Sequence, residues 1–196
     1  MKGQFATALL LAAMTFPMIA QAQLPSLGGA GPSPDAVVKN YVEGAKNVLR
    51  AQGKLLTAIN KKEEGARATL LADNLTEGAT KQNLEDATKT QTDNSKLLED
   101  SFKAKGTAVD AASKVVYAEG LGYLGKGVIK YLALVKDLKN FKPSITAIGS
   151  TAVAAAYVAQ TLPGNMGSLS TSLSAAVDFG RAQGVEIPAD ATAALK

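Results

Sequence analysis

The sequence predicts an all-α protein, an elongated antiparallel bundle of about five helices preceded by a flexible N-terminal leader rich in Gly and Pro. Three observations support this fold class. Apolar residues recur at spacings of three and four along most of the chain. No segment alternates apolar and polar residues between hairpin turns, the pattern that would predict a sheet. Finally, proline and glycine gather at a few places and divide the chain into segments of helix length.

Residues 1–22 have the pattern of a secretory signal peptide. Lys2 supplies the positive charge, residues 5–19 form an apolar stretch, and Ala20-Gln21-Ala22 fits the small-x-small cleavage rule. A membrane anchor is the alternative, but the apolar stretch is short and Pro17 interrupts it. We therefore expect export to the bacterial periplasm or the cell exterior, with cleavage after Ala22.

The rest of the chain divides into three parts. Residues 23–34 are rich in Gly and Pro and are expected to form the flexible leader. Residues 35–187 are expected to form a single helical-bundle domain, and residues 188–196 a short tail or terminal helix. A domain of this size needs no disulfide or metal to bury a core, and the absence of cysteine excludes a disulfide scaffold and a lipid-anchored thiol.

The first helix has a clear start signal. Ser33 suits the capping position, Pro34 suits the first helical position, and Asp35 complements the helix dipole. A helical stripe of apolar residues then extends to Ile59, and residues 60–62 either end the helix or form an exposed turn within a longer one. The next segments are a weaker helical stripe over residues 63–75 and a break at residues 76–78.

Residues 80–96 form the most polar part of the domain, with only Leu84 and Ala87 apolar. They could form an exposed helix or a loop. We favour a helix because residues 79–105 contain neither Gly nor Pro, and loops of that length are uncommon in compact domains. The apolar stripe resumes beyond them, so residues 79–118 are expected to form one long helix or two helices in series.

Four glycines, at positions 120, 122, 125 and 127, are expected to separate that helix from the next. They match G-x-G-x-x-G superficially, but a dinucleotide site requires a preceding strand, and here a helical stripe precedes them. We interpret them as a helix kink or a close helix crossing. A seam with the spacing of a coiled coil follows, and Pro143 stops it. The seam includes Leu121, Leu124, Val128, Tyr131 and Val135.

Two further helices are expected after the seam. Residues 145–162 form a helix rich in Ala, Ser and Thr that ends at Pro163, and residues 168–183 form a helix closed by Gly184. The first is long enough to cross a bilayer, but its small residues supply little transfer free energy. We therefore favour a buried central helix and keep reversible membrane contact as the alternative.

The chain contains no histidine and no cysteine, so the usual zinc, haem, thiol and Ser-His-Asp chemistries are excluded. The acidic residues lie among lysines in polar segments, which favours a solvated surface over a catalytic pair. We therefore expect no catalytic residue, no metal site and no cofactor. With a net charge of only +4 and no tryptophan, we expect no nucleic-acid partner.

Taken together, these observations favour an exported, non-catalytic binding or scaffolding component. It would act through its polar helix and bundle surface on an envelope or extracellular protein, or on a second copy of itself. A carrier of a lipid or other hydrophobic small molecule is one alternative, with a groove formed by Leu121, Leu124, Val128, Tyr131 and Val135. A protein that inserts residues 120–162 into a membrane is another. Anionic lipid would then contact Lys126, Lys130, Lys136, Lys139 and Lys142.

Overall fold

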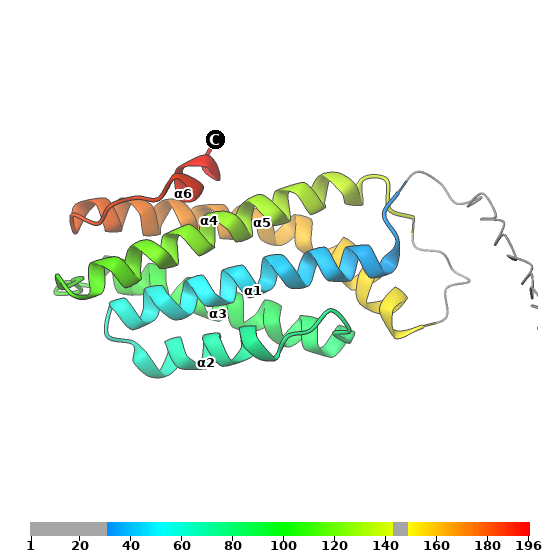
Figure 1. Ribbon diagram of the computed structural model, residues 1–196, viewed down its shortest axis with the longest axis horizontal. Helices are drawn as coiled ribbons and strands as arrows, with labels where there is room; N and C mark the ends of the chain where they lie inside the picture. The colour runs from blue at the N-terminus through cyan, green and yellow to red at the C-terminus, as the bar shows by residue number, and fades with distance from the viewer. Residues whose placement is uncertain (1–30, 143–148) are drawn as a thin grey trace, which may run out of the picture.

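The computed structural model describes residues 31–142 and 149–196, so the predicted signal peptide, its cleavage site and most of the predicted leader lie outside the described residues. Within the described ranges there are helices and no strand. The helices are α1 (Pro34–Ala58), α2 (Lys62–Asn74), α3 (Lys81–Lys103), α4 (Ser113–Leu138), α5 (Ser150–Ala182) and α6 (Ala189–Ala193). Successive long helices run in opposite directions along an elongated bundle (Figure 1), which confirms the predicted fold class.

The boundaries of α1 follow from local hydrogen bonding. The Ser33 hydroxyl accepts a hydrogen bond from the backbone N–H of Ala36 at 3.2 Å, as expected for a capping serine. At the other end Asn60 has φ 65°, and the N–H of Lys61 donates to the carbonyl of Leu56 at 2.8 Å. This is the bonding of a Schellman motif. The predicted start is confirmed, and of the two alternatives for residues 60–62 the structure supports the helix end.

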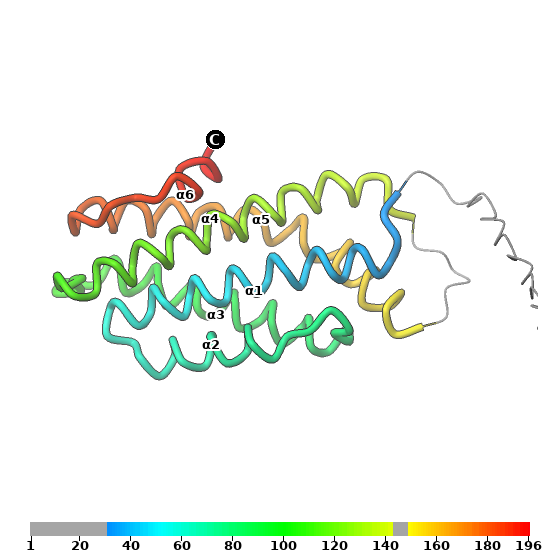
Figure 2. Tube along the Cα trace, viewed as in Figure 1, coloured from blue at the N-terminus to red at the C-terminus, as the bar shows by residue number. Residues whose placement is uncertain are grey.

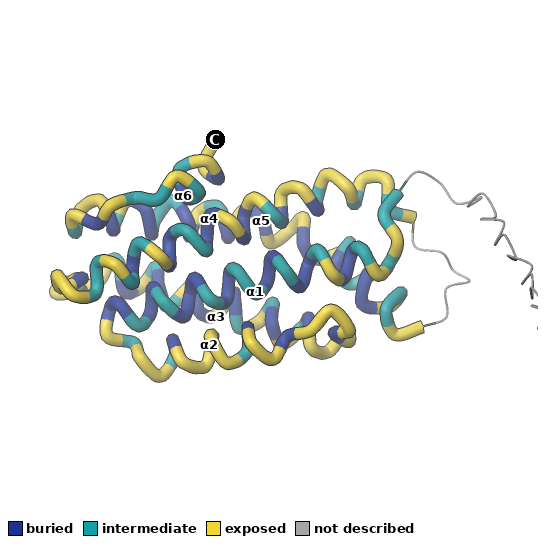
Figure 3. The backbone as a smooth tube through the Cα atoms, in the orientation of Figure 1, coloured by how far each residue is buried: buried dark blue, intermediate teal, exposed yellow. Residues whose placement is uncertain are grey.

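The polar segment forms α3, as predicted. Thr80 and Asn83 cap its start reciprocally, with the Thr80 N–H donating to Asn83 Oδ1 at 3.0 Å. The inward face of α3 is more polar than the sequence suggests, because Gln91 and Asn94 are both buried there. Figure 3 shows buried positions along α3 on the side facing the bundle. This helix is therefore part of the core packing and not an appendage.

The boundary expected at the four glycines is wrong. The chain leaves the helical state earlier, at residues 104–112, where Gly106 has φ 89°. The carboxylate of Asp110 then accepts the N–H of Ser113 at 2.7 Å, which lowers the pKa of Asp110 and supplies the cap that Ala112 lacks. From Ser113 onward α4 continues without interruption through all four glycines.

Two of these glycines lie where α4 crosses α1. A Cβ atom on Gly127 would lie 2.7 Å from Val48 Cγ2, and one on Gly120 would lie 2.9 Å from Leu55 Cγ. Since carbon atoms in contact normally stay about 3.5–4.0 Å apart, any side chain here would force the helices away from each other. Of the two interpretations given above, a close helix crossing is the one the structure supports.

The helix end expected at Pro163 is also wrong, because α5 continues through it to Ala182 (Figure 2). Pro163 lacks the N–H that would bond to the carbonyl of Ala159, but it lies on the exposed side of α5, where water can reach that region. The end of α5 is as predicted. Gly184 has φ 67°, and the N–H of Val185 donates to Gly180 at 2.9 Å.

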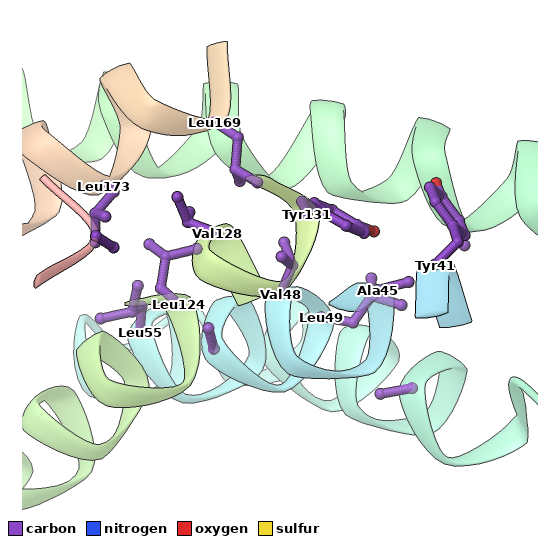
Figure 4. Packing of buried hydrophobic residues seen from close by; sticks show 14 of the residues in the cluster. Tyr41, Ala45, Val48, Leu49, Leu55, Leu124, Val128, Tyr131, Leu169 and Leu173 are labelled. Carbon is purple, nitrogen blue, oxygen red and sulfur yellow. The ribbon is translucent and has the colours of Figure 1, made fainter. Parts of the chain in front are cut away.

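The core follows α1, which packs against α2, α3, α4 and α5. Figure 4 shows side chains from α1, α4 and α5 meeting in this core. The largest fully buried members include Leu49, Leu55, Leu121, Leu124 and Leu173. The short α6 packs on α4 over Gly125, with Ala191 fully buried. A cavity lies at the side where α3 and α5 run next to each other.

Candidate functional site

A cavity of about 240 Å³ lies between α3 and α5. This volume is slightly below the roughly 300–1,000 Å³ usual for small-molecule sites. Residues of α3 supply one wall, residues of α5 supply the other, and tyrosines of α1 and α4 form the floor. The lining residues are Tyr41, Thr88, Gln91, Thr92, Ser95, Lys96, Glu99, Tyr131, Leu162, Asn165, Met166, Ser168 and Leu169.

The floor consists of two stacked tyrosines, Tyr41 and Tyr131, whose ring centroids are 5.2 Å apart with an interplanar angle of 24° (Figure 4). The ring of Tyr131 fits against α1 because residue 44 is glycine, and a Cβ there would lie 2.5 Å from Tyr131 Cε1. Burial raises the pKa of both phenols, so both hydroxyls stay neutral near pH 7. The Tyr41 hydroxyl is within 2.6 Å of Thr88 Oγ1.

Two buried amide side chains, Gln52 and Asn94, lie beside the tyrosines. Gln52 is 1% exposed, and its Nε2 donates to the backbone carbonyl of Gln91 at 2.7 Å and to Ser95 Oγ at 3.1 Å. Its Oε1 accepts from Asn94 Nδ2 at 3.3 Å. These bonds tie the middle of α3 to α1. The rigid backbone that results holds the Gln91 side chain at the cavity.

The Gln91 side-chain amide is bonded much less well than that of Gln52. Both of its polar atoms contact the same oxygen, the Tyr131 hydroxyl, with Nε2 at 3.3 Å and Oε1 at 3.4 Å. Each distance is at the long end for a hydrogen bond. Every buried side-chain nitrogen and oxygen of the described residues has a partner, but Gln91 has only these two long side-chain bonds.

The rim carries one charge of each sign, both from α3. Lys96 is exposed, whereas Glu99 is half-buried and its carboxylate accepts a hydrogen bond from Ser172 Oγ at 2.7 Å. Because these two residues are the only charged groups among the lining residues, the cavity has no net charge. Thr92 is exposed at the mouth, and its hydroxyl bonds to the Thr88 carbonyl of its own helix.

The buried part of the opposite wall is apolar, and the two polar lining residues of α5, Asn165 and Ser168, are exposed. Leu162, Met166 and Leu169 are buried and follow one another at spacings of four and three, so they share one face of α5. This face exists because α5 continues past Pro163. If the helix ended at the proline, Leu162 would not be in line with Met166. The cavity therefore has a polar wall on α3 and a wall on α5 that is apolar at its buried positions and polar at its exposed ones.

The arrangement does not bring acidic residues together for catalysis at the cavity, where Glu99 is the single lining carboxylate. Several acidic residues pair with basic residues at the surface instead, for example Asp73 with Arg50 at 3.0 Å and Glu77 with Lys39 at 3.1 Å. Among the described residues, no three His, Cys, Asp or Glu side chains lie close enough to hold a metal ion.

The structure places most of the predicted groove in the core. Leu121, Leu124 and Val128 are buried against other helices, and Val135 is partly buried against the same cluster. Tyr131 is the one member of that set that lines the cavity. Whether a ligand binds near these residues stays a prediction, and the available space lies farther along, between α3 and α5.

The predicted lysine set lies on the outer side of α4 and just beyond its end, and two of its members are paired. Lys130 forms an ion pair with Glu43 of α1, and Lys126 lies 3.7 Å from Asp190. The remaining members, Lys136, Lys139 and Lys142, are exposed. None of the helices in residues 31–142 and 149–196 has both the length and the hydropathy needed to cross a bilayer.

The α3 side of the cavity was not predicted from the sequence, because its lining residues do not form an apolar stripe. The inward positions of α3 do keep helical spacing, at Leu84, Thr88, Gln91, Ser95 and Leu98, but three of the five are polar. The sequence therefore does contain a helical face on α3, with a leucine at each end and polar residues between them. Recognising it requires treating Thr, Gln and Ser as residues that can be buried when they are hydrogen-bonded.

Comparison with models of known protein families, with curated protein sequences and with solved structures gives no match.

Proposed function

We propose that this chain is an exported, non-catalytic binding protein that holds a small molecule in the cavity between α3 and α5. The observation that carries the proposal is the cavity itself, a space lined by polar side chains of α3 and by three buried apolar side chains of α5, Leu162, Met166 and Leu169. Ligand sites typically combine apolar surface with a few placed polar groups. Elsewhere the buried residues are mostly Leu, Val and Ala.

The polar lining supports binding over pure scaffolding. Burying Gln91 costs free energy unless its amide is hydrogen-bonded, and a leucine at this position would pack at lower cost. The tyrosine floor adds two neutral hydroxyls that can donate or accept. A helix that served only as a spacer would gain nothing from this arrangement.

The same features distinguish the proposal from a lipid carrier. A cavity of about 240 Å³ is smaller than the usual site for a drug-sized ligand, so it suits a compact molecule and not a long acyl chain. Hydrogen-bonding groups on Thr88, Gln91 and Ser95 favour a ligand that has polar atoms toward α3. Export is supported by the signal-peptide pattern of residues 1–22, and the non-catalytic role by the absence of histidine and cysteine.

A ligand-observed NMR screen of small fragments tests this function, with two tryptophan variants as a matched pair. Thr92→Trp places a large side chain at the cavity mouth from an exposed position, so the core is left intact. Asp93→Trp adds the same side chain one residue away, at an exposed position that does not line the cavity. It removes only a surface ion pair with Lys89, which contributes little.

We expect the screen to find fragments that bind the wild-type protein and the Asp93→Trp variant but not the Thr92→Trp variant. A library in which nothing binds would overturn the proposal. So would fragments that bind all three proteins equally, because the bound site would then lie away from the cavity.

A further inference from the structure

Two opposite charges of α3 line the cavity without pairing with each other. Lys96 and Glu99 are three positions apart, a spacing that places their Cβ atoms about 5–6 Å from each other on one side of the helix. Within residues 31–142 and 149–196, neither of them forms an ion pair with any residue. Both charged groups are therefore available to a ligand in the cavity.

The other lysines of α3 that have an acid four positions later behave differently. Lys81 and Lys89 each form an ion pair with that acid, at 3.1 Å and 2.7 Å. Lys96 has an acid at the same spacing, Asp100, yet in the described part of the chain these two residues form no ion pair. Lys96 lines the cavity, whereas Lys81 and Lys89 do not. The lysine at the cavity is thus the one left without its acid.

The carboxylate of Glu99 is held at the cavity by α5. It accepts a hydrogen bond from Ser172 Oγ at 2.7 Å, and the side chain is half-buried. This bond uses one of about four lone-pair sites of a carboxylate, so Glu99 can accept further hydrogen bonds. Since hydrogen bonds between ionised groups are the stronger ones, an ammonium group on the ligand is a suitable partner.

The lining changes in character with depth. Its exposed residues are polar on both helices, namely Thr92, Lys96, Asn165 and Ser168. Its buried residues are two tyrosines, Gln91 and three apolar residues of α5. The amide of Gln91 already contacts the Tyr131 hydroxyl, so the deep part of the cavity suits a hydrocarbon group. A charged group at the rim keeps its contact with water and avoids the cost of desolvation.

We propose that the cavity binds a free α-amino acid with an apolar side chain. Its carboxylate lies at Lys96, its ammonium group lies at Glu99, and its side chain points inward to the buried residues of α5. Such a molecule has adjacent charges of opposite sign and no net charge, which matches the two offsetting charges of the lining. This inference rests on the proposed function, since it names the ligand class of the same site, and it adds Lys96 and Glu99 as specificity-determining residues.

Three molecules with the same branched hydrocarbon group test this class: leucine, isoamylamine and isocaproate. Isoamylamine lacks the carboxylate of leucine, and isocaproate lacks its ammonium group. Dissociation constants would be measured by NMR titration of the wild-type protein. We expect leucine to bind about tenfold more tightly than either of the others, because each of them leaves one charge of the lining without a partner.

Two variants assign the charges to their partners. Lys96→Gln removes the positive charge, and Glu99→Gln removes the negative charge while keeping an oxygen that can accept the Ser172 hydroxyl. In Lys96→Gln we expect the preference for leucine over isoamylamine to fall below about threefold, while the preference over isocaproate persists. In Glu99→Gln we expect the reverse, because the ammonium group is then the one without a partner.

Lys103→Gln and Glu85→Gln are the matched controls, since they make the same changes on α3 outside the lining. Both preferences should persist in them. Three results would overturn the inference: no binding of leucine, equal binding of the three molecules, or preferences that neither cavity variant alters. These results leave the proposed function standing if other fragments bind and are lost in Thr92→Trp. They differ from failure of the function itself, in which no fragment depends on Thr92.

Discussion

The crossing of α1 and α4 gives a sharp prediction, because Gly127 has no room for even one methyl group. In Gly127→Ala the new Cβ would lie 2.7 Å from Val48 Cγ2, 3.1 Å from the Val48 backbone nitrogen and 3.3 Å from the Gly44 carbonyl oxygen. Two of these three atoms belong to the α1 backbone, and the third belongs to a β-branched side chain with little rotamer freedom. The helices must therefore move apart.

The expected size follows from two opposing effects. Overpacking in a filled core costs about 1–3 kcal/mol, and contact with backbone favours the upper half of that range. Replacing glycine by alanine inside a helix raises the free energy of unfolding by about 1 kcal/mol, because alanine has the higher helix propensity. We expect Gly127→Ala to lower the free energy of unfolding by about 1–2 kcal/mol.

Gly167→Ala is the matched control, since Gly167 is also inside a helix but has no atom near its missing Cβ. Only the helix-propensity effect operates there, so we expect a gain of about 1 kcal/mol. Urea unfolding followed by circular dichroism measures both variants. Equal stability of Gly127→Ala and Gly167→Ala would refute the close crossing.

Three further predictions concern single residues. Gln52→Leu should lower the free energy of unfolding by about 1–3 kcal/mol in urea, because Asn94 loses its acceptor inside the bundle; an unchanged value would contradict the buried network. Burial raises the pKa of Tyr117, so the folded protein keeps a proton that the unfolded chain releases above about pH 10, and stability falls as pH rises beyond that point. Tyr117→Phe should reduce this decline by about 1.4 kcal/mol per pH unit in alkaline urea titrations, and an identical slope would refute the assignment. Pro163→Ala should raise the melting temperature, because it restores a donor within a continuous helix at a gain of about 1–2 kcal/mol, whereas a drop would indicate that α5 does end there.

The sequence predicted those features that depend on neighbours along the chain. The start of α1 at Ser33, Pro34 and Asp35 and the end of α5 at Gly184 rely on hydrogen bonds within a few residues. Both are therefore visible in the local sequence. The fold class was predictable for a similar reason, because helical spacing repeats along most of the chain.

The errors arose where tertiary contacts outweigh local preference. The glycines of α4 are poor helix formers, yet the close approach that Gly127 and Gly120 allow to α1 offsets that cost. Pro163 is tolerated because it lies on the solvent side of α5. Neither circumstance can be inferred without knowing which helix lies opposite.

The cavity was the least predictable part. It depends on the burial of Gln91 in a segment whose polar composition predicts exposure to solvent. Its neighbour in sequence, Thr92, is exposed, so the polarity of the segment as a whole gives no indication of which side faces inward. Only the packing of α3 against α1 and α5 determines that side.

The methyl group of Met166 offers the most direct test of the central claim that the cavity holds a small molecule. Met166 lines the cavity, and the other three methionines, Met1, Met14 and Met18, all lie within the predicted signal peptide. The protein purified from its producing cells would be labelled with ¹³C at the methionine methyl groups, and Met166→Leu would identify the resonance. We predict that the tightest-binding fragment shifts the Met166 methyl resonance saturably in the wild-type protein and not in Thr92→Trp. A bound fragment that leaves this resonance unmoved would contradict the account.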